Sequence, residues 1–241
     1  MILAIEVSNL SAVEPVQGAS DDPRPGLALG SADDGPRRVV GTRAITGAQP
    51  LEVELLRGIE ELYRSCGVVP AQTSLIAVSC GPGGYTSLRI ACSVAMAIAE
   101  STGARCCAVP TALAVARRAK RFPCCVVLSS KDDTAYAAIF DASGRVIDQG
   151  LRNAATLAWD RFDLLLGDRF LPGDLRAKAE QRGVEVALPV FDPVSVLELA
   201  GDLPGEVAGG VKVCAPEALA PIYPREPEAV TKWALRRTDN P

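Results

Sequence analysis

The 241-residue chain contains no histidine. That absence excludes a Ser-His-Asp triad, a Cys-His dyad, a histidine general base and every metal site that needs an imidazole ligand. Any chemistry would have to run on carboxylates, Lys, Ser, Thr, Cys or backbone groups. Histidine-dependent hydrolysis is therefore not among the functions to consider.

Aromatic residues and long apolar runs are also scarce, and the net charge is negative. Aromatics make up 5% of a chain that is 48% hydrophobic, so the core must consist mainly of Ala, Val, Leu and Ile. The net charge of −4 argues against broad electrostatic binding to nucleic acid. No stretch reaches the ~18 apolar residues that span a bilayer, and the first residues lack the basic region of a signal peptide. We therefore expect a cytosolic protein that makes no contact with membranes.

The eight cysteines include no Cys-x-x-Cys pair. Cys106-Cys107 and Cys124-Cys125 lie within apolar runs, where the two side chains of each pair would point to opposite faces of a strand. A disulfide framework is not expected in a cytosolic chain of this size, and no spacing supports zinc. We interpret the cysteines as small buried hydrophobic residues and expect no metal site.

The apolar pattern predicts an α/β arrangement that occurs twice. The first half is expected to contain strands at 2–7, 26–32, 37–45, 75–79 and 105–109, with helices at 51–66, 86–101 and 111–120. The second half is expected to contain strands at 124–130, 135–140, 145–149, 163–166 and 184–188, with helices near 172–181 and 193–201. Two such halves predict two α/β domains with mixed sheets, at 1–110 and 111–221. A C-terminal helix at about 222–238 would complete the first domain.

A glycine-rich turn lies between a predicted strand and a predicted helix, in Ser-Cys-Gly-Pro-Gly-Gly-Tyr-Thr-Ser-Leu-Arg-Ile at 79–90. Gly81, Gly83 and Gly84 permit tight backbone, and Thr86 is expected to cap the helix. Free amides at such a turn can hold an anion, so these four residues form a candidate anion loop. The alternative is a purely structural turn, because glycine-rich turns before helices are common.

This segment resembles the Gly-Pro-Gly-Ser-Phe-Thr-Gly-Leu-Arg-Ile signature of the TsaB (YeaZ-like) family. Gly, Tyr and Ser replace the family's Ser, Phe and Gly at positions 84, 85 and 87. Residues 2–5, 109–113 and 221–225 resemble the family's opening strand, a helix start and the closing Pro-x-Tyr-Leu-Arg, in that order. The resemblance spans nearly the whole chain.

The resemblance implies a two-domain actin-like fold of the ASKHA (RNase H-like) superfamily. It also implies a non-catalytic scaffold that supports the catalytic subunit TsaD, beside the ATPase TsaE, in threonylcarbamoylation of tRNA adenosine 37. TsaD binds its metal through a His-x-x-x-His pair, which this chain cannot provide. Contact with tRNA is expected to be indirect, and no catalytic residue is expected.

Two departures from the family bear on nucleotide binding. Where the family usually opens with Asp-Thr-Ala/Ser, this chain has Glu6-Val7-Ser8. Where the family has Asp-Ala-Arg after the first strand of the second half, this chain has Ser129-Ser130-Lys131. Loss of that Asp weakens the case for a nucleotide held with a metal ion. We expect that no cofactor is required, with ATP or ADP binding left open. The alternative function is a divergent ASKHA paralogue with weak nucleotide binding or ATPase activity.

In the family, TsaD is contacted through the first two helices, which are 51–66 and 86–101 here. The candidate interface residues are Leu55, Ile59, Leu62, Arg89, Ala91, Ala95 and Ile98. The alternative for the apolar side chains is the chain's own core. The alternative for Arg89 is an ion pair that holds the two domains together. Formation of a homodimer is also left open.

Overall fold

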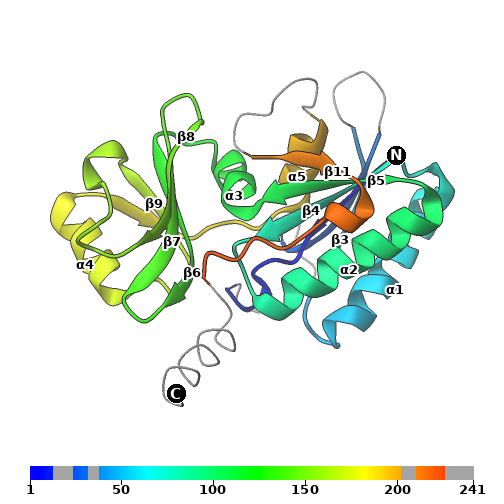
Figure 1. Cartoon of the computed structure of the whole chain (residues 1–241), viewed down its shortest axis with the longest axis horizontal. Coiled ribbons are helices and arrows are strands. Elements are labelled where there is room, and N and C mark those ends of the chain that lie inside the picture. The colour runs from blue at the N-terminus through cyan, green and yellow to red at the C-terminus, as the bar shows by residue number, and fades with distance from the viewer. Residues whose placement is uncertain (13–23, 32–37, 202–209, 226–241) are drawn as a thin grey trace, which may run out of the picture.

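The computed structural model describes residues 1–12, 24–31, 38–201 and 210–225, and within them the chain forms two mixed β-sheets with helices on their faces (Figure 1). The first sheet has the strand order β11-β5-β4-β1-β2-β3 and the second has the order β10-β9-β6-β7-β8. The predicted fold class, α/β with two mixed sheets, is confirmed.

The first sheet places the amino-terminal strand near its centre. β1 pairs in parallel with β4 and antiparallel with β2. Both central strands are buried along their whole length, which is typical of strands covered on both faces. The strands are β1 (Ile2–Glu6), β2 (Gly26–Gly30), β3 (Val39–Ala44), β4 (Leu75–Gly81), β5 (Arg105–Pro110) and β11 (Lys212–Cys214).

The second sheet is built around β6, which runs parallel to β9 and antiparallel to β7. Its strands are β6 (Cys124–Lys131), β7 (Thr134–Phe140), β8 (Val146–Arg152), β9 (Leu164–Gly167) and β10 (Glu185–Ala187). The predicted hairpin corresponds to β7 and β8, which pair antiparallel.

The helices and sheets form alternating layers (Figure 1). α1 (Leu51–Cys66) and α2 (Tyr85–Thr102) cover the outer face of the first sheet, while α3 (Thr111–Ala119) and α5 (Pro193–Gly201) lie between the sheets. α4 (Gly173–Arg182) covers the outer face of the second sheet. Short 3-10 turns occur at Leu10–Ala12, Pro70–Gln72, Trp159–Arg161 and Pro216–Ala218.

The adjacent cysteines are divided between different cores, as their alternation in strands predicts. Cys106 lies in the core beneath α1 and α2, whereas Cys107 lies in the core between the sheets. Cys124 faces the core between the sheets, and Cys125 faces the core beneath α4. All four thiols are buried and free, so the interpretation as small core residues is confirmed for them.

Three expectations about the end of the chain need correction or lie outside the described residues. The glycine- and proline-rich segment 202–221 was assigned no regular element, but β11 within it pairs with β5 at the edge of the first sheet. α5 also packs against β1 and β2, so α5 and β11 belong with the first sheet and not with a second domain ending at residue 221. Most of the predicted helix at 222–238 lies outside the described residues, and residues 222–225 form no helix.

Candidate functional site

The glycine-rich turn joins β4 to α2 and lies against the chain that leaves β1. The Gly84 amide donates a hydrogen bond to the Ser8 carbonyl oxygen at 2.7 Å, and the Asn9 side-chain amide donates to the Pro82 carbonyl oxygen at 3.3 Å. A Cβ atom at Gly83 would lie 2.3 Å from the Ser8 oxygen. The close approach of the two backbones is itself enough to require glycine at position 83.

Two amides of the candidate anion loop already have protein acceptors. The Gly81 amide donates to the Thr111 hydroxyl at 3.0 Å, and the Gly84 amide is bonded as described above. α2 begins at Tyr85 without a side-chain cap, and the Thr86 side chain is exposed, so the predicted capping role of Thr86 is wrong. Anion binding here stays a prediction, and it would require Gly81 and Gly84 to leave their present partners.

Glu6 ends β1 beside this turn and is fully buried. Its Oε1 atom accepts hydrogen bonds from the backbone amide and the hydroxyl of Ser8, at 2.8 and 2.6 Å. Its Oε2 atom has no hydrogen-bond partner among the described residues. Burial raises the pKa of Glu6, against the opposing effect of the Ser79 and Ser8 hydroxyls. A raised pKa favours the neutral acid, which is a poor ligand for a magnesium ion.

The residues Pro221–Arg225, which we call the strap, pack against the glycine-rich turn. The Ile222 amide donates to the Cys80 carbonyl oxygen at 2.7 Å. The Tyr223 ring stacks on the Tyr85 ring, with centroids 5.1 Å apart. The strap therefore covers the end of β4 and the start of α2.

The strap then reaches the second sheet, where its last described residue lies beside β6 (Figure 1). The Arg225 guanidinium donates to the Ser129 carbonyl oxygen at 2.5 Å. It also donates to the Thr134 carbonyl oxygen at 2.9 Å and to the Thr134 hydroxyl at 2.7 Å. These acceptors flank the turn between β6 and β7. Arg225 thus fastens the strap to the hairpin of the second sheet.

Five of the seven predicted interface residues lie in the chain's own core. Their side chains pack between the two helices and the first sheet: Leu55, Ile59 and Leu62 of α1, and Ala91 and Ala95 of α2. Ile98 is half-buried against the same core. Their burial favours the alternative, in which these five side chains belong to the chain's own core. The physical reason is that the apolar stripe of an amphipathic helix covers its own sheet first.

The outward surface of α1 and α2 carries a different set of side chains. Val53 and Leu56 on α1 are 37% and 54% exposed, and Tyr85 on α2 is 48% exposed. Arg89, also exposed, donates to the Tyr85 hydroxyl at 2.8 Å, and its guanidinium lies 5.2 Å from the Tyr85 ring centroid. Among the described residues Arg89 has no ion pair, so the predicted alternative of an interdomain ion pair is not observed. We call Val53, Leu56, Tyr85 and Arg89 the outer face.

Residues 47–199 match the family model for TsaD, described as tRNA N6-adenosine threonylcarbamoyltransferase. The match covers more than half of the chain, so the chain belongs to this family, and its role lies in the modification of tRNA. No curated protein matches the sequence.

Two solved structures from Pseudomonas aeruginosa share the fold over nearly their whole length. One, an uncharacterized protein with similarity to peptidase YEAZ, has a TM-score of 0.67 at 19% identity, with 93% of this chain and 99% of that chain covered. The other, YeaZ, has a TM-score of 0.62 at 19% identity, with 92% and 99% covered. Together with the family match, these structures confirm the predicted resemblance to YeaZ-like proteins of the ASKHA superfamily.

Sequence reasoning assigned no role to the strap, and of the outer face it named only Arg89 as a candidate interface residue. Pro221–Arg225 was recognised as a family landmark, but its contacts with Tyr85 and Thr134 join residues far apart in the sequence. Leu56 is not among the candidate interface residues, although it is 54% exposed and the adjacent Leu55 is buried. In the part of the chain that the structure describes, no helix is long and apolar enough to cross a membrane.

Proposed function

We propose that this chain is a non-catalytic partner subunit that binds TsaD through the outer face and supports threonylcarbamoylation of tRNA adenosine 37. The observation that carries the proposal is the absence of histidine from a member of the TsaD family. The resemblance implies that TsaD itself binds its metal through a His-x-x-x-His pair. A chain that keeps the fold without those ligands contributes by binding and not by metal-dependent transfer.

The composition of the outer face supports a protein partner. Tyrosine and arginine are enriched at the energetically important positions of protein interfaces. Here Arg89 holds Tyr85 in one orientation, which lowers the entropy lost on binding. Ser93 and Ala97 are exposed on the following turns of α2 and leave the surface flat enough for another helix to approach. In the absence of TsaD, a second copy of the chain is the alternative occupant.

We further propose that the chain requires no nucleotide, and that TsaE and tRNA are reached through TsaD. Three features support this proposal over the alternative of weak nucleotide binding or ATPase activity. Burial favours the neutral form of Glu6, the amides of Gly81 and Gly84 have internal acceptors, and the strap packs over the turn that holds them. A bound nucleotide with its metal ion would need a charged carboxylate and free amides at this place.

The experiment that tests the proposal is binding to TsaD from the same organism, measured by co-purification, sizing and calorimetric titration. The variants are Leu56→Asp and Arg89→Ala on the outer face, with Leu188→Asp as the matched control. Leu188 is 70% exposed and directly follows β10, a strand of the second sheet. We expect each outer-face variant to remain folded and to weaken binding at least about tenfold, because truncating a central interface residue costs about 2 kcal/mol or more. Leu188→Asp should bind as the wild type does.

Two results would contradict different parts of the proposal. If the folded wild-type chain does not associate with TsaD at all, the partner assignment is wrong. If the chain associates with TsaD but both outer-face variants bind as tightly as Leu188→Asp, TsaD is the partner and the outer face is not the binding surface. A measurable ATPase activity of the chain alone, abolished by Glu6→Gln, would favour the alternative function.

A further inference from the structure

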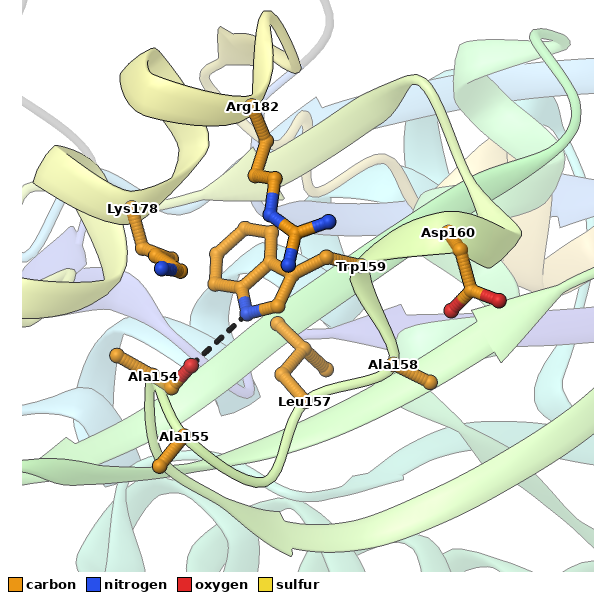
Figure 2. A pocket seen from close by; sticks show the side chains of 8 residues that line it. All are labelled: Ala154, Ala155, Leu157, Ala158, Trp159, Asp160, Lys178 and Arg182. Carbon is orange, nitrogen blue, oxygen red and sulfur yellow. Dashed lines mark hydrogen bonds between the residues drawn. The ribbon is translucent and has the colours of Figure 1, made fainter.

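A pocket of about 610 Å³ opens on the outer side of the second sheet, between the segment 154–160 and α4 (Figure 2). α4 lies at the opposite end of the molecule from α1, so the pocket is remote from the outer face (Figure 1). Its size falls within the range of about 300–1,000 Å³ that is usual for small-molecule sites. A ligand bound in this pocket would therefore not contact the outer face.

The wall of the pocket is fixed in place by hydrogen bonds. The Asn153 side-chain oxygen accepts from the Thr156 amide at 3.0 Å. The Trp159 indole N–H donates to the Ala154 carbonyl oxygen at 2.9 Å, the dashed line in Figure 2. The indole ring also packs on Phe162, with centroids 5.8 Å apart. A wall held in this way is preorganised, so a ligand would not lose free energy in ordering it.

Two positive side chains converge on this pocket. Lys178 and Arg182 lie one turn apart on α4 and both reach toward the indole of Trp159 (Figure 2). Neither forms an ion pair within the described part of the chain. Other cations of the described residues are paired with carboxylates, namely Arg43, Arg64, Arg118, Arg121 and Arg152. Like charges one turn apart repel each other, and an anion between them would remove that repulsion.

The opposite end of the pocket carries the reverse charge. Asp160 lines the pocket on the far side of Trp159 from Lys178 (Figure 2). It repels a second negative group on the same ligand, so the site disfavours polyphosphates and nucleic acid backbone. It also offers acceptor oxygens to a donor at the far end of a ligand. Between the two ends the floor is apolar, formed by Leu157 and Trp159.

We propose that this pocket binds a small organic carboxylate with a flat apolar body. Its carboxylate contacts Lys178 and Arg182, its body lies over Trp159 and Leu157, and a hydroxyl or amine at its far end donates to Asp160. No residue of the glycine-rich turn or of the outer face takes part.

The test uses three probes on the full chain: 4-hydroxybenzoate, benzoate and inorganic phosphate. The readout is the indole N–H signal of Trp159 in a proton–nitrogen correlation spectrum. The chain has two tryptophans, and Trp233→Phe assigns the signals. We expect 4-hydroxybenzoate to shift the Trp159 signal saturably with a Kd on the order of 1 mM, which is typical of so small a ligand. Benzoate lacks the donor and should bind about tenfold more weakly.

Variants on α4 decide whether the two cations hold the carboxylate. Lys178→Ala and Arg182→Ala should each weaken 4-hydroxybenzoate binding by about tenfold to a hundredfold, because a hydrogen bond to a charged group is lost. Arg176→Ala on the same helix removes an exposed arginine that does not line the pocket, and it should leave binding unchanged. Asp160→Asn should bring benzoate and 4-hydroxybenzoate closer in affinity.

The outcomes that would overturn the proposal are distinct. A Trp159 signal that none of the probes shifts saturably would show that the pocket takes no carboxylate. Equal weakening by Arg176→Ala, or equal shifts with phosphate and 4-hydroxybenzoate, would show non-specific attraction to a positive helix. Equal affinity for benzoate and 4-hydroxybenzoate would remove Asp160 from the site.

Discussion

Replacing Arg225 with alanine should loosen the connection between the two sheets. The guanidinium donates three hydrogen bonds, to the Ser129 carbonyl oxygen and to two oxygens of Thr134, across the turn between β6 and β7. At the other end of the strap, Ile222 and Tyr223 are held by the first sheet and α2. Arg225→Ala removes one end of this connection and leaves the other intact.

The expected loss follows from the number of bonds and their exposure. A hydrogen bond that involves a charged group contributes about 1.5–3 kcal/mol when it is buried. Arg225 is half-buried, so its guanidinium regains water when released, and we expect a total loss of about 2–3 kcal/mol. In a chain of this size that loss lowers Tm by about 4–12 °C. Arg225→Lys keeps the charge but loses the planar fork, and it should recover at most about half of the loss.

Thermal unfolding by calorimetry and amide hydrogen exchange would measure the effect. In Arg225→Ala the Ile222 amide should exchange faster than in the wild type, because the strap opens more often. Arg176→Ala is the control, since that side chain is exposed on α4 and should change stability by less than about 0.5 kcal/mol. If Arg225→Ala unfolds within about 1 °C of the control and Ile222 stays protected, the strap does not connect the sheets.

Two further substitutions test the surroundings of the glycine-rich turn. Burial raises the pKa of Glu6, so wild-type stability should fall as pH rises from the unfolded value of about 4.3 through the higher folded-state pKa. Glu6→Gln should abolish that fall in urea unfolding curves measured between about pH 4 and pH 8, and a wild-type stability that follows the same pH dependence as the variant would refute the raised pKa of Glu6. Gly83→Ala should cost about 1–3 kcal/mol because its Cβ would lie 2.3 Å from the Ser8 oxygen. A Cβ atom at Gly173 would have no atom within 4 Å, so Gly173→Ala should instead stabilise α4 by about 0.5–1 kcal/mol. Equal effects of Gly83→Ala and Gly173→Ala would contradict the close approach of the Ser8 backbone to Gly83.

The regular elements could be predicted where one local signal dominated. α1 spans Leu51–Cys66 as expected, because its apolar residues recur at helical spacing and Gly67 ends it with a φ of 65°. α5 also has the predicted bounds, 193–201. β11 could not be predicted, because it has three residues and lies in a glycine- and proline-rich region. β11 is a strand because it pairs with β5, about a hundred residues earlier in the chain. A local sequence pattern cannot predict pairing between segments so far apart.

For the candidate interface, the sequence indicated two amphipathic helices but not which of their side chains are exposed. The periodicity of α1 shows that one face is apolar, but it does not say whether a sheet or a partner covers that face. Leu55 is fully buried and Leu56 is 54% exposed, so one position along the helix decides between core and surface. The glycine-rich turn shows the same limit. Its glycines indicated an anion site, whereas Gly83 is required by the Ser8 backbone.

Tyr85 connects the surface proposed for docking with the strap and the glycine-rich turn. Its hydroxyl accepts a hydrogen bond from Arg89 on the outer face, and its ring stacks on Tyr223 of the strap. A partner that contacts Tyr85 would therefore also affect the position of the strap, which Arg225 holds to the second sheet through hydrogen bonds. Under the proposed binding role, contacts of this kind would require both sheets. The second sheet holds the strap in place, and the strap holds one side of Tyr85.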